Sequence, residues 1–117
     1  MYSDWGSHRL PVYEGTCHLL LNEPAEAVAI LEAVIEKLGG NREKINVVLA
    51  ATVDLASSYA DLGELEQSCA ILGDAYDQLQ QIGNHRGIAR ARAARQRLAR
   101  WDAEPVVRQL DSRMAAA

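Results

Sequence analysis

The 117-residue chain contains no phenylalanine, and aromatic residues make up only 5% of it. Alanine, leucine, glutamate and arginine are abundant instead, and these residues favour helix over strand. Hydrophobic residues account for 49% and charged residues for 24%, proportions that are ordinary for a globular protein. The length suits a single domain with a modest core. We therefore expect an all-α protein of one domain.

Long apolar runs and cysteine pairs are also missing. No stretch approaches the 18 or so uninterrupted apolar residues of a membrane-spanning helix, so we expect no membrane contact. The first six residues lack the basic and apolar regions of a secretory signal. Cys17 and Cys69 show no local pairing pattern and are interpreted as free thiols. Together these features favour a cytoplasmic location.

The net charge of −4 is unevenly spread along the chain. Residues 1–84 hold 4 basic and 13 acidic side chains, whereas residues 85–117 hold 8 basic and 3 acidic ones. The basic C-terminal part is open to two interpretations. It forms a surface for nucleic acid or an acidic partner, or it packs beside the acidic part of the same molecule.

An internal repeat organises the sequence. Residues 21–31 align without gaps with residues 62–72 at an offset of 41. Each copy is centred on a turn between two helices. Gly63 and Gly83 are expected to end helices in the left-handed conformation, Asn22 does so less easily, and Pro24 opens the following helix. With apolar residues recurring every three or four positions, we expect helices near 9–21, 24–38, 43–62, 65–82, 86–100 and 104–115.

Both units resemble the tetratricopeptide repeat (TPR), a helix–turn–helix unit with large and small residues at set positions. Unit two matches the family pattern through Leu55, Ala56, Tyr59, Gly63, Ser68, Leu72 and Ala75. Unit one matches it through Gly15, Asn22, Ala27, Leu31 and Val34, with His18 replacing the family tyrosine and Glu14 its leucine. The offset of 41 exceeds the usual spacing of about 34, and the proline that follows the second helix is missing.

This resemblance implies antiparallel helix pairs stacked as a short right-handed superhelix of about six helices. Residues 1–8 would lead into repeat one at 9–41, followed by repeat two at 43–84. Residues 85–117 would form a degenerate capping pair, in which polar side chains end the core against water.

A narrower resemblance covers much of the chain. Residues 54–60, 83–87, 95–101 and 106–111 are similar to the C-terminal repeat region of actinobacterial helix-turn-helix regulators of the Xre type. In those proteins a DNA-binding domain precedes the repeats, and nothing in this chain resembles that domain. The resemblance implies a bacterial protein associated with transcription regulation, with the repeats serving as a sensing or dimerising domain.

Motifs for catalysis and metal binding are sparse. His18 lies beside Cys17, but no metal-ligand spacing such as CxxC, HxxxH or HExxH is present. The pairs Glu23/Glu26 and Glu64/Glu66 fall in first turns of helices, where carboxylates offset the helix dipole. We expect no metal, no cofactor and no enzymatic activity.

Two candidate surfaces remain. The concave groove of the resembling family maps onto Arg9, Val12, Thr16, Leu19, Ala50, Val53, Ser57 and Asp61. A candidate basic face consists of Arg86, Arg90, Arg97 and Arg100, which would bind a carboxylate, a phosphate or nucleic acid. The basic segment lacks the interleaved aromatics of a base-stacking surface. Its alternative is a solvated face that makes ion pairs with Asp and Glu of unit two.

We expect an interaction module that binds a protein or peptide in the groove, with homodimerisation as an option. No direct contact with nucleic acid is expected from this segment. The alternatives are a small-molecule sensor that uses the same groove, or an accessory protein to a biosynthetic enzyme. An open groove would favour a protein partner, and a closed pocket of several hundred Å³ would favour a small ligand.

Overall fold

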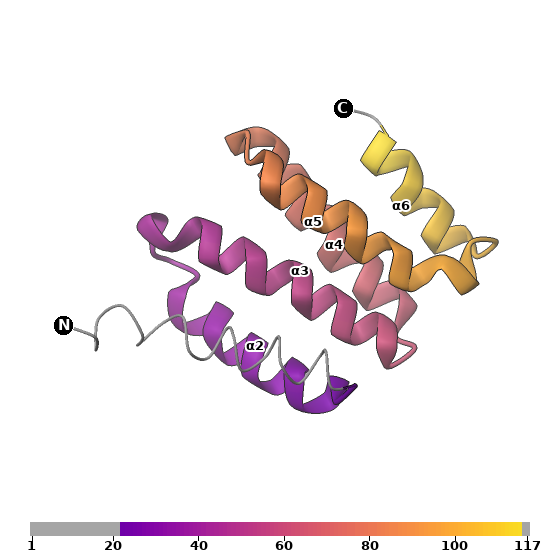
Figure 1. The fold of residues 1–117 in the computed structure, drawn as a ribbon, viewed down its shortest axis with the longest axis horizontal. Helices are drawn as coiled ribbons and strands as arrows, with labels where there is room; N and C mark the ends of the chain where they lie inside the picture. The colour runs from indigo at the N-terminus through magenta and orange to yellow at the C-terminus, as the bar shows by residue number, and fades with distance from the viewer. Residues whose placement is uncertain (1–21, 116–117) are drawn as a thin grey trace.

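The computed structural model describes residues 22–115, and this part of the chain is all-helical, without any β-strand (Figure 1). It contains five α-helices and two 3₁₀ segments. Their bounds are α2 Pro24–Leu38, η1 Arg42–Lys44, α3 Ile45–Asp61, α4 Leu65–Ile82, α5 His85–Arg95, η2 Gln96–Trp101 and α6 Pro105–Ala115. The helix expected at 9–21 lies outside the described residues.

The helix ends follow local signals closely. Asn22, Gly63 and Gly83 have φ values of 63°, 80° and 68°, which confirms the left-handed turns expected from the sequence. Pro24 opens α2 as predicted. Two expected helices are subdivided. The segment 43–62 begins with the 3₁₀ turn η1, and the segment 86–100 changes from α-helix to 3₁₀ helix after Arg95.

Helix α3 is the centre of the molecule, with eleven of its seventeen residues buried. One side of α3 packs against α2, and the other sides pack against α4 and α5. Two apolar clusters result. The first joins α3 to α4, α5, η2 and α6 through residues such as Leu49, Val53, Leu72, Leu98 and Leu110. The second joins α3 to α2 through residues such as Leu31, Val34, Val48, Leu55 and Tyr59.

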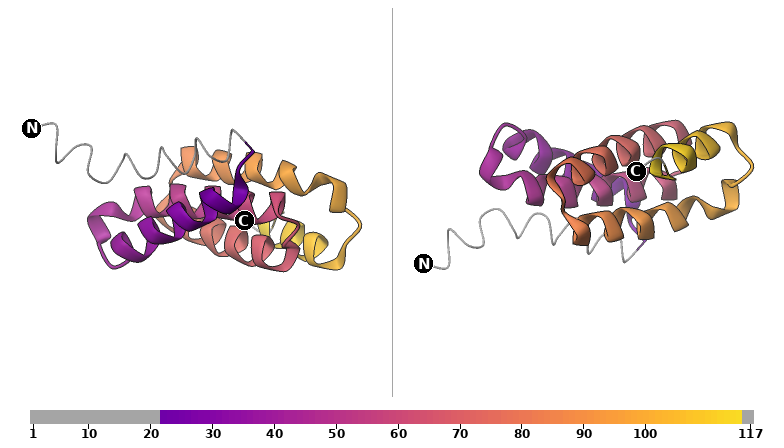
Figure 2. Two further views of the ribbon diagram at one scale, coloured as in Figure 1. Left: turned by 90° about the horizontal axis from the view of Figure 1, so that it is seen from below. Right: turned by 90° about the horizontal axis from the view of Figure 1, so that it is seen from above.

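Alternate helices lie beside each other. Helix α5 packs along α3, and α6 packs along α4, while α4 also contacts α5. Both views in Figure 2 show α5 on one side of the molecule, with α4 and α6 on the other. The small side chain of Ser68 lets α3 and α4 approach closely. Its buried hydroxyl donates directly to the backbone carbonyl oxygen of Ala56 at 2.7 Å.

Candidate functional site

Two ion pairs join α3 to the arginine-rich segment. Arg90 on α5 donates to Asp54 at 2.7 Å, and Arg97 in η2 donates to Asp61 at 2.5 Å. The two aspartates are seven residues apart, as are the two arginines. Seven residues are two turns of a helix, so the pairs lie one above the other on helices that run in the same direction. We call these two pairs the Asp–Arg ladder.

A second set of ion pairs, between α4 and α6, has a similar spacing along the sequence. We call α3 with α5 one layer and α4 with α6 the other. Arg113 on α6 donates to Asp74 and to Asp77 on α4, each at 2.7 Å. The partners in this layer are 36 and 39 residues apart, and the partners in the ladder are 36 apart. The α5–α6 pair therefore follows the α3–α4 pair at a similar sequence offset in both layers, although the sequence repeat between the two pairs is degenerate.

Arg95, the last residue of α5, links α5 to α6. Its Nε and Nη2 atoms donate to both carboxylate oxygens of Asp111 at 2.5 and 2.8 Å, and Nη2 also reaches Asp102 at 2.7 Å. The hydrogen bonds from Arg95 hold the pKa of Asp111 below its ordinary value. The bond to Asp111 in turn raises the pKa of Arg95. These groups bind each other, so we interpret them as a structural clamp.

A cleft of about 170 Å³ opens where the N-terminal halves of α3 and α5 meet the end of α4. Its apolar lining consists of Leu49, Ala50, Val53 and Leu79. Its polar lining consists of Asn46, Asn84, Arg86 and Arg90, with the Gly87 backbone between them. This arrangement of an apolar floor and a polar rim can receive one apolar side chain and hydrogen-bond the groups beside it.

The polar rim offers hydrogen-bond donors. The Asn84 carboxamide oxygen accepts from the Gly87 backbone N–H at 2.8 Å and so caps α5. The Asn84 nitrogen donates to the carboxamide oxygen of Asn46 at 3.0 Å. Each of the two amide oxygens therefore already accepts one hydrogen bond. Within residues 22–115 Arg86 makes no ion pair, and the Asn46 NH₂ group and the Arg86 guanidinium are left to donate to a bound group.

The predicted groove residues divide into three groups. Ala50 and Val53 line the cleft. Neither Ser57 nor Asp61 lines the cleft: Ser57 is only 4% exposed, and Asp61 is paired with Arg97. Arg9, Val12, Thr16 and Leu19 lie outside the described residues.

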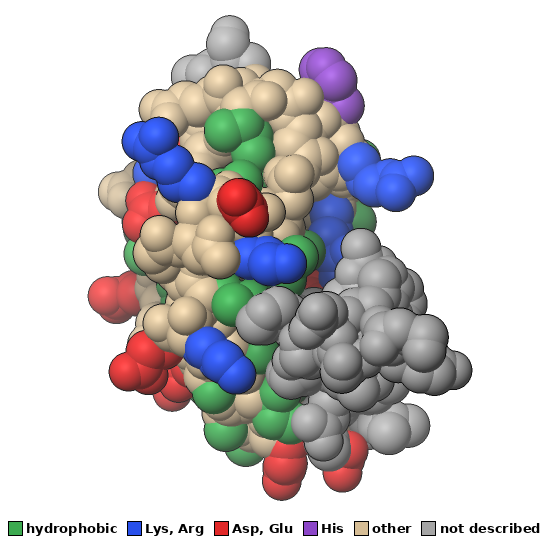
Figure 3. Space-filling view, turned by 90° about the vertical axis from the view of Figure 1, so that its left-hand side faces the viewer, with side chains coloured by type: hydrophobic (Ala, Val, Ile, Leu, Met, Phe, Trp, Pro, Cys, Tyr) green, Lys and Arg blue, Asp and Glu red, His purple; other side chains and the backbone are tan. Residues whose placement is uncertain are grey.

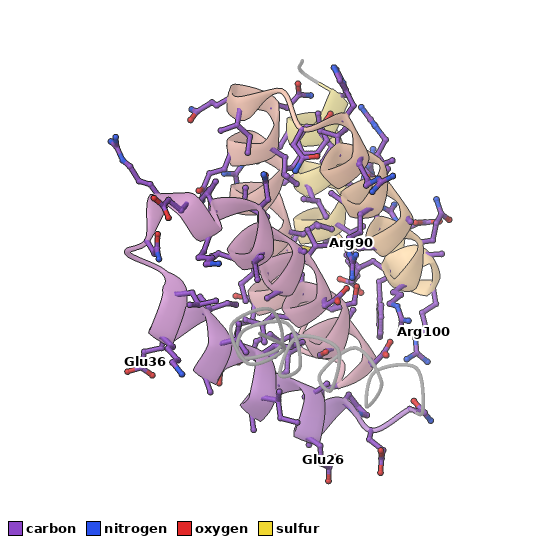
Figure 4. The ribbon with its side chains drawn as sticks, turned by 60° about the vertical axis from the view of Figure 1, so that its left-hand side comes forward. Glu26, Glu36, Arg90 and Arg100 are labelled. Atoms are coloured by element: carbon purple, nitrogen blue, oxygen red, sulfur yellow. The ribbon has the colours of Figure 1, made fainter. Side chains whose placement is uncertain are left out.

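The predicted basic face is not a single surface. Arg86 and Arg90 line the cleft, whereas Arg97 pairs with Asp61. Arg100 covers the ring of Trp101, with its guanidinium carbon 4.3 Å from the ring centroid. Figure 4 shows Arg90 directed toward α3 and Arg100 at the far end of the arginine-rich segment.

Several cleft residues were not predicted from the sequence. Asn46 lies one turn before Ala50 on α3, so helical spacing from the groove positions would have found it. Asn84 directly follows Gly83, which the sequence marked only as the end of a helix. Leu79 and Gly87 reach the cleft because α5 folds back over the end of α4, and no local pattern signals that approach.

Exposed apolar surface is limited in this structure. Leu62 and Ile82, 43% and 48% exposed, are the only large hydrophobic side chains classed as exposed within residues 22–115. Figure 3 shows the face at the N-terminal ends of α3 and α5, where hydrophobic side chains form small separate patches among polar and charged ones. The described residues on this face therefore form no broad apolar area of the kind that marks an obligate interface.

Other reactive groups lie away from the cleft. A hydrogen bond to Glu32, together with burial, raises the pKa of Tyr59 to about 12. Burial raises the pKa of the Cys69 thiol. In the described part of the chain, no group of three or more His, Cys, Asp or Glu side chains is placed to hold a metal ion. None of the helices there combines the length and apolar character of a membrane span.

Comparisons with known proteins give no relative. No family model, no curated protein and no solved structure matches the chain. The TPR resemblance and the narrower regulator resemblance remain predictions from the sequence.

Proposed function

We propose that this chain is a non-enzymatic interaction module of TPR type, and that the cleft between α3 and α5 binds a peptide segment of a partner protein. The observation that carries the proposal is the cleft itself, with an apolar floor and a rim of hydrogen-bond donors. In a repeat stack, the side chains of neighbouring first helices form the concave binding surface.

The packing of alternate helices supports a repeat stack. Helices α3 and α5 lie together, α4 and α6 lie together, and the partners in both layers are 36 to 39 residues apart. A spacing near 34 residues is that of the TPR. On this proposal α3 and α4 form one repeat, and α5 with α6 forms the next.

The size of the cleft favours a peptide over a small molecule. Pockets for small molecules commonly measure about 300 to 1,000 Å³ and enclose most of the ligand. A cleft of about 170 Å³ is large enough for one side chain and open enough for the chain on either side to continue. The small-molecule sensor is therefore the weaker candidate.

The charged groups support a binding role without catalysis. Asp111, Arg95 and Arg113 have shifted pKa values because they pair with each other or with neighbouring side chains. Tyr59 and Cys69 do not line the cleft. Arg95 and Asp111 line a groove of about 290 Å³ together, but they are hydrogen-bonded to each other there.

The narrower resemblance suggests where such binding is used. If the chain is related to the repeat region of Xre-type regulators, the bound segment belongs to a protein that controls transcription, or to a second copy of the chain. We propose this role on the resemblance alone.

A displayed library of random 12-residue peptides, selected on the immobilised full chain, tests the proposed function. Ala50 is half-buried in the cleft wall, so Ala50→Leu should fill the cleft and abolish binding of the selected peptides. Ala70→Leu is the matched control, since Ala70 lines a separate groove between α4 and α6. The Ala70 variant should bind the selected peptides as the unmodified chain does.

Two results would contradict the proposed function. One is a library that yields no enriched peptides on the unmodified chain. The other is a set of enriched peptides that binds the Ala50→Leu variant as tightly as the unmodified chain, which would place the binding surface elsewhere. Circular dichroism of both variants establishes that the helices are retained.

A further inference from the structure

The arginine-rich segment carries six arginines between residues 86 and 100. A helix of this composition would ordinarily attract nucleic acid and other polyanions, because each arginine that reaches a phosphate releases bound counterions. In this structure three of the six are paired with carboxylates: Arg90 with Asp54, Arg97 with Asp61, and Arg95 with Asp111 and Asp102.

We propose that Asp54 and Asp61 determine the binding specificity of this surface, by holding Arg90 and Arg97 in the Asp–Arg ladder and so preventing the binding of polyanions. The partner that fits the cleft is then an apolar peptide segment bearing at most one carboxylate, placed against Arg86. This inference rests on the proposed function only in taking the α3–α5 cleft as the binding surface.

The burial of the ladder carries the argument. The Asp54 side chain is 9% exposed and the Asp61 side chain 21% exposed, so both carboxylates are less exposed than the arginines that they bind. The arginines are the outer members, at 44% and 34% exposed. A ligand phosphate would therefore meet guanidinium groups whose charge is already balanced by a fixed carboxylate directly behind them.

The position of Arg90 gives the ladder its effect on the cleft. Arg86 and Arg90 are four residues apart on α5 and both line the cleft. Side chains with this spacing are neighbours on a helix surface, and two unpaired arginines so placed would suit a doubly charged phosphate. Because Asp54 balances Arg90, Arg86 is the one charged side chain of the cleft within residues 22–115 that remains for a ligand, together with the Asn46 amide donor.

Fluorescence anisotropy of a labelled 20-residue oligothymidylate provides the test, with the full chain at 50 and 200 mM sodium chloride. The Asp54→Asn/Asp61→Asn variant frees both arginines. At 50 mM salt we expect it to bind the oligonucleotide at least about tenfold more tightly than the unmodified chain. Its affinity should fall more steeply with salt, by about 0.7 in log–log slope for each freed arginine.

Two control variants isolate the ladder from net charge. Glu26→Gln/Glu36→Gln removes the same two negative charges from exposed positions on α2, which Figure 4 shows pointing away from the ladder. This variant should bind the oligonucleotide no better than the unmodified chain. Adding Arg90→Gln and Arg97→Gln to the double asparagine variant should abolish the gain in affinity.

Because Asp54 is buried, its replacement carries a risk to folding, and Asp61→Asn alone then serves as the test with about half the change in slope. The proposal is overturned if folded variants gain no affinity, if the glutamine control gains as much, or if the unmodified chain already binds the oligonucleotide equally well. Peptides that still bind these folded variants in the cleft would leave the proposed function standing. A failed peptide selection on the unmodified chain would remove the proposed function but not the ladder.

Discussion

Ion pairs of similar sequence spacing join α3 to α5 and α4 to α6, but their carboxylates differ in burial. In the α3–α5 layer, the Asp54 side chain is 9% exposed beneath Arg90. In the α4–α6 layer, Arg113 binds Asp74 and Asp77, whose side chains are 70% and 47% exposed. A carboxylate in water loses little when its partner leaves, whereas a buried carboxylate loses a donor that water cannot easily replace. Similar contacts therefore have different consequences in the two layers.

The largest expected effect on stability comes from replacing Arg90, and replacing Arg113 in the other layer provides the comparison. Arg90→Met keeps much of the apolar stem but removes the Arg90 guanidinium from its hydrogen bond with the buried Asp54 carboxylate. We expect it to lower the free energy of unfolding by about 2 kcal/mol. Arg113→Met should lower it by less than about 1 kcal/mol. Urea denaturation followed by circular dichroism measures both, and equal losses would show that burial does not distinguish the layers.

The side of α3 that faces α2 provides a contact of another kind, between a neutral phenol and a carboxylate. Tyr59 donates to Glu32 on α2 at 2.7 Å, and this bond with burial raises the pKa of Tyr59 from 10.0 to about 12. A raised folded-state pKa stabilises the fold below pH 10, and this stabilisation is lost as the pH rises toward 12. We expect a loss of up to about 2 kcal/mol over this range.

The control for this pH dependence is Tyr59→Phe, which has no phenol to ionise. Its free energy of unfolding should change less than that of the unmodified chain between about pH 9.5 and 12. This range begins just below the ordinary tyrosine pKa of about 10. Urea denaturation at a series of pH values makes the comparison. Parallel curves for the two proteins would mean that Tyr59 titrates normally.

The smallest expected effect concerns how Arg113 reaches its partners. A Cβ atom at Gly73 would lie closer to the Arg113 guanidinium than van der Waals contact allows, so the Arg113 side chain, which crosses α4 at that point to reach Asp74 and Asp77, would have to shift. Alanine is the better helix former by about 1 kcal/mol. Gly73→Ala should therefore stabilise an Arg113→Ala background by about 0.5 to 1 kcal/mol.

In the unmodified background the same substitution displaces Arg113, so its gain should be smaller by a few tenths of a kcal/mol. A double-mutant cycle by urea denaturation measures this coupling. Identical effects of Gly73→Ala in the two backgrounds would show that the Arg113 contacts contribute nothing to stability.

The helices were largely predictable because their ends are marked locally. The bounds of α2 and α4 agree with the predicted 24–38 and 65–82, since turn residues with positive φ precede or follow each of them. The change to 3₁₀ geometry in η2 was not predictable. Residues 96–101 contain neither glycine nor proline, so nothing local marks the change, while Leu98 within this segment is buried in the core.

The candidate site was predictable only in part. The groove positions of the resembling family identified Ala50 and Val53, helical spacing identified Arg86 and Arg90, and the structure brings these four residues to one cleft. The same spacing placed Arg97 and Arg100 with them, because a helix surface says nothing about which partners its neighbours offer. Pairing between helices 36 residues apart depends on their packing register, and that register is a property of the folded core.

The position of α3 in both apolar clusters has a consequence for the dynamics of the chain. Helix α2 can detach while the first cluster stays intact, and α6 can detach while the second stays intact, but α3 cannot be released without disrupting both. Because α2 and α6 each contribute to one cluster, their opening disrupts fewer buried contacts than the opening of α3. Amide protons in the middle of α3 should therefore exchange with deuterium only through global unfolding, while those of α2 and α6 exchange through local fraying.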